Sequence, residues 1–310
     1  MATERELELP DGRTVRFWDT GVPETAGAHA GGEPSPDSAG GRRDDPRAAL
    51  TVIWHHGTPQ TGRVLEPVVQ AAAARGIRVV SCARAGYPGT SVLPGRTVAD
   101  AAADAVAVAA ALGLDRYAAV GASGGGPHAL ACAALDPDHV IGAVTLAGIA
   151  PYTDAYDWFA GMASPGALSG ALRGGRDERQ RYGETAEFDE SSFIDLDWAA
   201  LQAEWAPLGA DANRASVEAT EGGEPPWGEI DDDVAFTTAW GFELSTIGCP
   251  TLHVQGGRDR VVPLSHGEWL AALLGSGEFW LRPNDGHISV LGALPVAFDW
   301  LIDVAERSAR

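Results

Sequence analysis

The chain has 310 residues and a net charge of −21, and 45% of its residues are hydrophobic. Its length suits one large α/β domain with an insertion, and its apolar content is ample for a core. Repulsion from phosphate groups disfavours nucleic acids and anionic membrane surfaces, so we expect neither as a partner. Every basic residue is arginine, which excludes a catalytic lysine and a Schiff base to pyridoxal phosphate.

Cysteine spacing and the N-terminus bear on metals and on the cellular compartment. Cys82, Cys132 and Cys249 lack the close spacing of metal ligands, so we expect reduced thiols, no metal and no cofactor. The N-terminus has neither a basic start nor an apolar run, which predicts that there is no signal peptide. The longest apolar stretch, residues 105–112, is too short to span a bilayer. We therefore expect a soluble, cytoplasmic protein, and the sequence leaves its oligomeric state open.

The first predicted elements form a hairpin. Residues 5–9 and 14–19 flank an Asp-Gly pair, which is a turn signal. Residues 21–48 are rich in Gly, Pro, Asp and Ala and have almost no large apolar side chains, which predicts a mobile surface loop. The apolar run at 51–55 is typical of a buried parallel strand.

From residue 51 onward, apolar runs alternate with helical segments. We expect further strands at 78–83, 117–121, 140–147, 251–256 and 278–281, and helices at 64–75, 98–112, 125–135, 264–274 and 293–307. Strands and helices that alternate at this spacing form βαβ units, so the sequence predicts a mostly parallel sheet.

This alternation stops over residues 151–247, where helical patches occur without a strand signal. A helical insertion here would lie as a lid over the carboxyl edge of the sheet, where open α/β sheets bind ligands. The segment holds 20 acidic residues, five arginines and five tryptophans. Its aromatic side chains either line an apolar pocket or pack the lid against the body. Its acids either form a solvated outer face or attract cationic substrates at a pocket mouth.

The candidate nucleophile is Ser123, within the sequence GASGG at 121–125, which matches G-x-S-x-G. The motif follows a predicted strand and precedes a predicted helix, which is the setting of a nucleophile elbow. So tight a turn needs small flanking residues, and Gly121, Gly124 and Gly125 meet that need. The alternative is a glycine-rich turn with an ordinary serine.

Hydrolysis of an ester or amide makes a tetrahedral oxyanion, which needs preorganised donors. We expect one donor to be the N–H of Gly124, directly after the nucleophile. The second should come from the loop HGTP at 56–59, where the Thr58 N–H is the natural donor behind His56 and Gly57. The alternative is a simple turn after a strand.

A serine hydroxyl needs a base to remove its proton, and the base needs a carboxylate to orient it. His287 follows the last predicted strand and lies downstream of Ser123, in the chain order of this type of elbow. Asp259, in the loop after the 251–256 strand, falls between them. Asp285 is the competing carboxylate, but it stands only two residues before the base. A capping role in the loop is the alternative for Asp259.

The remaining histidines are interpreted as structural. We expect His253 in the core, His139 and His266 at the surface, and His128 facing away from the serine oxygen. His55 and His56 point to opposite sides of an extended segment, which argues against a shared metal.

Together these motifs resemble the α/β-hydrolase superfamily: HGTP at 56–59, RAGYPGTS at 84–91, GASGG at 121–125, GGRD at 256–259 and GH at 286–287. The resemblance implies an eight-stranded, mostly parallel sheet flanked by helices, with a helical lid after the sixth strand. Residues 1–150 and 248–310 would form the core, and 151–247 the cap. The segment at 84–91 looks like the family's R-x-G-x-G-x-S loop, which is structural and borders the site.

The function implied is a serine hydrolase, like a carboxylic ester hydrolase, that cleaves a small ester, lactone, thioester or amide through an acyl-enzyme. A serine nucleophile disfavours the aspartate-dependent members of this fold. Proline iminopeptidases typically have an HGGPG loop and a tryptophan in the elbow, and both are absent here. C–C bond hydrolases usually carry a glycine-rich HGxGPG loop. A proline-iminopeptidase-like aminopeptidase and a non-catalytic binding protein of the same fold stay as alternatives.

Overall fold

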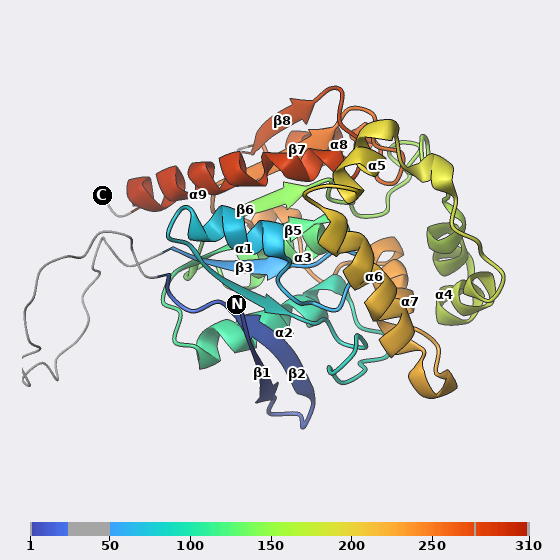
Figure 1. Cartoon of the computed structure of the whole chain (residues 1–310), viewed down its shortest axis with the longest axis horizontal. Helices are drawn as coiled ribbons and strands as arrows, with labels where there is room; N and C mark the ends of the chain where they lie inside the picture. The colour runs from blue at the N-terminus through green and yellow to red at the C-terminus, as the bar shows by residue number, and fades with distance from the viewer. Residues whose placement is uncertain (1, 24–49, 276, 309–310) are drawn as a thin grey trace, which may run out of the picture.

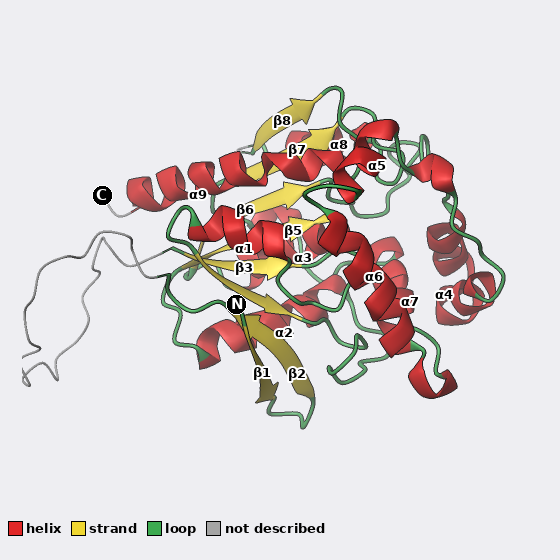
Figure 2. Ribbon diagram, viewed as in Figure 1, coloured by secondary structure: helices red, strands yellow, loops and turns green. Residues whose placement is uncertain are grey.

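The computed structural model describes residues 2–23, 50–275 and 277–308, and it is built on an eight-stranded sheet with the order β1-β2-β4-β3-β5-β6-β7-β8. Strands β3 to β8 are parallel to one another, while β1 and β2 form a hairpin that pairs antiparallel with β4 (Figure 2). The strands are β1 Thr3–Glu8, β2 Thr14–Asp19, β3 Thr51–His55, β4 Arg78–Cys82, β5 Tyr117–Ala122, β6 Val140–Leu146, β7 Thr251–Gly256 and β8 Glu278–Arg282. The predicted mostly parallel, eight-stranded sheet is therefore confirmed.

Helices cover both faces of the sheet, because alternate side chains of each buried strand point to opposite faces. On β3, Ile53 lies in one apolar core, while Val52 and Trp54 lie in the other. The first core is closed by α2 Val98–Ala111, α3 Gly126–Leu135 and α8 Leu264–Leu273, and the second by α1 Glu66–Ala73 and α9 Leu294–Ser308. In Figure 1, α1 and α9 lie in front of the sheet, with α3 and α8 behind it.

Between β6 and β7 the chain forms a helical segment, called the insertion here and comprising residues 147–250. Its helices are α4 Gly166–Gly183, α5 Asp195–Leu201, α6 Ala206–Ala219 and α7 Trp227–Thr237. Helices α4, α6 and α7 lie beyond the carboxyl ends of the strands (Figure 1). Three ion pairs join α4 to α7: Arg176 with Asp231, and Arg179 with both Asp233 and Glu229. The helical segment therefore lies at the sheet edge where the sequence places the nucleophile.

Some expectations need correction or cannot be compared. From residue 24 onward, the loop predicted at 21–48 lies outside the described residues. The predicted helix at 125–135 is α3, preceded by a short 3-10 turn, η1 Ser123–Gly125. The surface prediction for His266 is wrong: the side chain is buried, and its ring packs against that of Trp158. Among the described helices, none is long and apolar enough to cross a bilayer.

Candidate active site

Ser123 lies at a strained turn between β5 and α3. Its φ of 53° falls in the left-handed region, which a residue with a side chain adopts only where its surroundings impose it. The turn is crowded: a Cβ on Gly121 would lie 2.1 Å from the Gly125 carbonyl oxygen, and a Cβ on Gly125 would lie 2.0 Å from that of His55. Both positions therefore require glycine. The turn leaves the Ser123 side chain half-buried at the carboxyl end of β5.

Three predicted site residues from separate loops meet at this turn. Ser123 Oγ lies 2.9 Å from Nε2 of His287, and His287 Nδ1 lies 2.8 Å from Oδ2 of Asp259. The other oxygen of Asp259 accepts the N–H groups of Val261 at 2.8 Å and Val262 at 2.9 Å. Because this carboxylate is held by its own loop, it can fix the orientation of the imidazole ring.

The competing carboxylate points elsewhere. Asp285 accepts a hydrogen bond from Arg282 Nε at 2.6 Å, and this pair lies on the exposed side of the loop. The geometry brings Asp259 rather than Asp285 to the His287 ring, as the chain order favours.

The surroundings of His287 act on its pKa in opposite directions. Burial lowers the pKa, because it disfavours the charged ring. The charge and hydrogen bond of Asp259, with the charge of Asp197, outweigh burial and raise the pKa above its usual range. A base with a raised pKa accepts a proton readily, provided that the pH leaves the ring neutral.

The HGTP loop runs beside the elbow. The N–H of Gly57 donates to Gln60 Oε1 at 2.6 Å and is therefore engaged within the loop. A Cβ on Gly124 would lie 2.5 Å from Thr58 Oγ1, which places Thr58 directly against the elbow. The Gly124 N–H belongs to the first turn of η1, where N–H groups lack an intrahelical acceptor. The predicted donors Thr58 and Gly124 thus lie side by side.

Arg84 anchors the HGTP loop through three hydrogen bonds. Its Nη1 donates to the His56 carbonyl oxygen at 2.5 Å, and its Nη2 donates to the Gly57 carbonyl oxygen at 3.2 Å and to Thr58 Oγ1 at 3.0 Å. The predicted role of the 84–91 segment as a structural border of the site agrees with these contacts.

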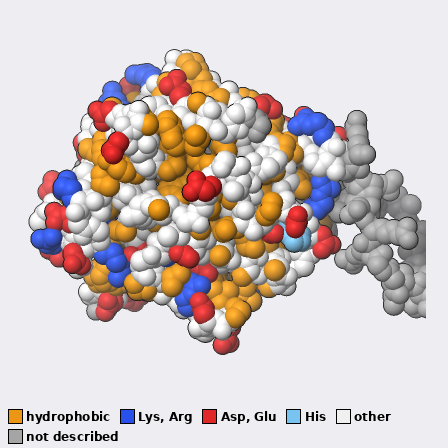
Figure 3. All heavy atoms as spheres, turned by 180° about the vertical axis from the view of Figure 1, so that it is seen from behind, with side chains coloured by type: hydrophobic (Ala, Val, Ile, Leu, Met, Phe, Trp, Pro, Cys, Tyr) orange, Lys and Arg blue, Asp and Glu red, His pale blue; other side chains and the backbone are white. Residues whose placement is uncertain are grey.

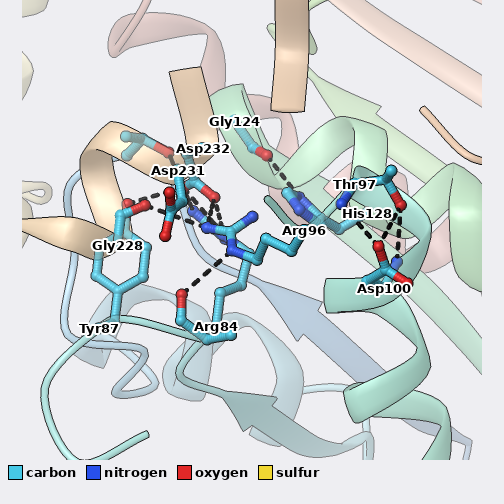
Figure 4. Close-up of polar contacts among 12 residues, drawn as sticks. Arg84, Tyr87, Arg96, Thr97, Asp100, Gly124, His128, Gly228, Asp231 and Asp232 are labelled. Carbon is cyan, nitrogen blue, oxygen red and sulfur yellow. Dashed lines mark hydrogen bonds and ion pairs between the residues drawn. The ribbon is translucent and has the colours of Figure 1, made fainter. Parts of the chain in front are cut away.

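Asp232, on α7, joins the insertion to this anchor (Figure 4). It accepts hydrogen bonds from Thr58 Oγ1 at 2.6 Å and Tyr87 Oη at 2.7 Å, and it pairs with Arg84 and Arg96, each at 2.5 Å. The side chains of all three charged residues are almost fully buried. Burial raises the pKa of Asp232, but the two guanidinium groups outweigh it and hold that pKa well below its usual range. The carboxylate is therefore ionised and neutralised by two arginines.

His128, on α3, supports the elbow through Gly124 (Figure 4). Its Nδ1 lies 2.9 Å from the Gly124 carbonyl oxygen, which only accepts, so Nδ1 carries the proton. Burial, with the charge of Arg84, holds the pKa of His128 well below its usual range, and the ring is neutral. It does not contact Ser123 Oγ among the described hydrogen bonds, in agreement with the structural role predicted from sequence.

Sequence reasoning missed the two aspartates of the insertion that reach the site, Asp197 and Asp232. It treated the acids of the insertion as solvated or facing a pocket mouth, whereas five of them are buried: Asp197, Asp211, Asp231, Asp232 and Asp233. A usable signal was the run of three aspartates inside a helix that also carries Ile230, Val234 and Phe236, since carboxylates amid apolar positions need partners when they are buried.

Two further features bear on ligands. Within the described residues, no group of three or more His, Cys, Asp or Glu side chains has an arrangement suited to a metal ion. A cavity of about 270 Å³ lies between the insertion and the loop of Asp259, lined by Phe193, Ile194, Asp195, Leu196, Arg258 and Arg260. Neither Ser123 nor His287 lines it, so this cavity is separate from the serine.

The sequence profile of the family described as alpha/beta hydrolase fold matches residues 51–293. The chain belongs to the α/β-hydrolase family. The match covers β3 through the His287 loop, and it therefore includes the insertion and all the residues of the candidate site. A search of curated proteins returns no match for this α/β-hydrolase.

Solved structures share the fold at low sequence identity. A hydrolase from Pseudomonas aeruginosa PA01 is 20% identical, with a TM-score of 0.64 over 97% of this chain and 98% of its own. The enol-lactonase from Burkholderia xenovorans LB400 is 15% identical, with a TM-score of 0.64 over 97% and 99%. An esterase from Exiguobacterium antarcticum is 16% identical, with a TM-score of 0.62 over 98% and 100%. At such identities the similarity establishes the fold.

Proposed function

We propose that this α/β-hydrolase is a serine hydrolase that cleaves a small ester, lactone, thioester or amide through an acyl-enzyme. The observation that carries the proposal is the chain of contacts from Ser123 Oγ to His287 Nε2, at 2.9 Å, and from His287 Nδ1 to Asp259 Oδ2, at 2.8 Å. A nucleophile, a base and an orienting carboxylate in hydrogen-bond reach are the parts that activate a serine.

The proposed reaction has two halves. His287 Nε2 takes the proton of Ser123 as Oγ forms a bond to the substrate carbonyl carbon, and the N–H groups of Thr58 and Gly124 stabilise the oxyanion. The tetrahedral intermediate then expels the leaving group, which takes the proton from His287. Water, deprotonated by the same ring, attacks the acyl carbon; the bond from that carbon to Ser123 Oγ then breaks, Oγ takes the proton back from His287, and the acid is released. The net change is addition of water across the acyl bond.

The proposed substrate class is small acyl compounds. Structures of similar fold include proteins named as an enol-lactonase, an esterase and a thioesterase domain, all of which act on acyl–oxygen or acyl–sulfur bonds by their names. We propose that the insertion acts as a cap that selects the substrate, because its helices lie over the carboxyl edge of the sheet where Ser123 is placed.

Covalent labelling by a fluorophosphonate tests the activation of Ser123. Attack of Oγ on phosphorus expels fluoride and leaves a phosphonyl ester, which peptide mass spectrometry assigns to a residue. We expect one adduct, at Ser123, in the wild type, and none in Ser123→Ala. Ser216→Ala is the control, because Ser216 is exposed on α6 and its hydroxyl donates a hydrogen bond to the Ala212 carbonyl oxygen of the same helix. Absence of an adduct at Ser123 in folded wild-type protein would overturn the proposal.

A further inference from the structure

One buried carboxylate of the insertion, that of Asp197, binds the loop that carries His287. Asp197 belongs to α5 and is only 1% exposed. Its Oδ2 accepts the N–H of His287 at 3.2 Å, and its Oδ1 accepts the N–H groups of Ile288 at 2.9 Å and Ser289 at 2.8 Å. Three successive amides of this loop therefore donate to one side chain that lies 90 residues earlier in the chain.

The remaining contacts of Asp197 fill its acceptor sites. Ser289 Oγ donates to Oδ1 at 2.9 Å, and the N–H of Ile194 donates to Oδ2 at 3.1 Å. Ser289 Oγ also accepts the N–H of Gly286 at 2.8 Å, so a fourth amide of the loop is tied in through the hydroxyl. A Cβ on Gly286 would lie 2.1 Å from Asp197 Oδ2, so the carboxylate packs directly on the backbone. With five donors around it, only an ionised carboxylate satisfies the set.

This arrangement restrains His287 at two points, its ring nitrogen and its backbone. Asp259 holds the imidazole through Nδ1, and Asp197 holds the backbone from which the ring projects. These two carboxylates are the charged groups that face the ring, and the charges of both favour its protonated form. Hydrogen bonds from amides to an ionised carboxylate are stronger than those between neutral groups, so the loop is tightly restrained.

We propose that Asp197 is a positioning residue for His287, so that the insertion completes the reactive geometry at Ser123 in addition to covering it. The inference rests on the proposed serine-hydrolase function. Asp197 acts through the His287 backbone and has no contact with Ser123. Displacement of a reacting group by about 1 Å can lower a rate about 100-fold, and release of the loop amides permits such a displacement.

Asp197→Asn tests this role with little change in shape. The amide nitrogen of the variant would face backbone N–H groups, which cannot accept, and the negative charge would be lost. We expect kcat for a p-nitrophenyl ester to fall about 10- to 100-fold with KM within about twofold of wild type. The acid limb of the pH profile should move to lower pH, because one charge that favours protonated His287 is gone. NMR titration of the His287 ring, assigned by comparison with His287→Gln, measures the same shift without turnover.

Asp195→Asn is the matched control, since Asp195 lies on the same helix but is exposed, and we expect wild-type kcat and pH profile from it. Ser289→Ala is a milder variant that removes one donor to Asp197, and it decides the matter if Asp197→Asn does not fold; we expect a kcat loss of several-fold with KM retained. Wild-type kcat and an unmoved His287 titration in folded Asp197→Asn would overturn the inference, as would a rise in KM alone. Inactivity of the wild type would instead refute the proposed function, while the NMR titration would still report on Asp197.

Discussion

At the scale of single residues, the proposed mechanism makes the reactivity of Ser123 depend on the protonation state of His287. The ring must be neutral to accept the proton of the serine, and its pKa is raised above the usual value of about 6.5. The protonated, inactive form therefore persists to higher pH than for an ordinary histidine. We expect kcat/KM for a neutral ester to rise with pH through a group that titrates above about 6.5. A profile that stays flat down to pH 5 would contradict a histidine base.

Substitution of Asp259 and of Asp285, the two carboxylates that the sequence offers as partners of His287, should lower kcat by different factors. Asp259→Asn removes the charge that orients the ring and favours the wrong tautomer, so kcat should fall on the order of 10⁴-fold. Asp285→Asn changes only a partly exposed pair with Arg282, and we expect less than about a threefold effect. Steady-state kinetics of both variants, with melting temperatures compared with wild type, measures the difference. If the losses came out in the reverse order, Asp285 would be the orienting residue.

At the scale of elements, two helices of the insertion each carry one buried aspartate that contacts the site. Asp197 of α5 binds the His287 loop, and Asp232 of α7 binds Thr58 and Arg84 beside the elbow. The insertion and the sheet edge are therefore joined through ionised side chains as well as through apolar contacts. We infer that loss of either aspartate disturbs the site and not the insertion alone.

Asp232→Ala should destabilise the protein strongly. It leaves the buried guanidinium groups of Arg84 and Arg96 without their shared carboxylate, and breaking a buried ion pair by removing one partner costs about 3–5 kcal/mol. Urea denaturation measures the free energy of unfolding. As the control, Glu204→Ala removes an exposed carboxylate of the insertion and should change that free energy by less than about 0.5 kcal/mol. A loss below about 1 kcal/mol for Asp232→Ala would show that the network contributes little.

Local sequence signals predicted the strands, turn and loops that carry Ser123, Asp259 and His287. The strand–turn–helix around Ser123 is encoded within about 20 residues, and the order of Ser123, Asp259 and His287 follows from which strands precede them. Asp232 and Asp197 could not be found in this way, because their partners lie 148 and 90 residues away. An acidic side chain in a helix is usually solvated. The apolar residues around Asp232 indicate that it needs a partner, but the packing of the insertion against the sheet is what identifies that partner, and for Asp197 the packing alone reveals the burial.

At the scale of the whole molecule, the acidity divides into two parts. Some acids of the insertion are buried and paired with arginines, as Asp231, Asp232 and Asp233 are. Others lie on the surface, and on the face drawn in Figure 3 they are scattered among arginines, apolar and uncharged side chains without forming one continuous patch. A net charge of −21 therefore acts as a diffuse field that repels other anions and favours solubility.

The central claim is that Ser123 forms a covalent bond to the acyl group, and turnover of a short-chain p-nitrophenyl ester by wild type and Ser123→Ala tests it most directly. Both proteins are compared at the same pH, with folding checked by circular dichroism and melting temperature. Loss of the nucleophile should lower kcat on the order of 10⁴- to 10⁶-fold, as removal of a serine from such a unit does, while the fold stays intact. Turnover by folded Ser123→Ala within tenfold of wild type would contradict the account.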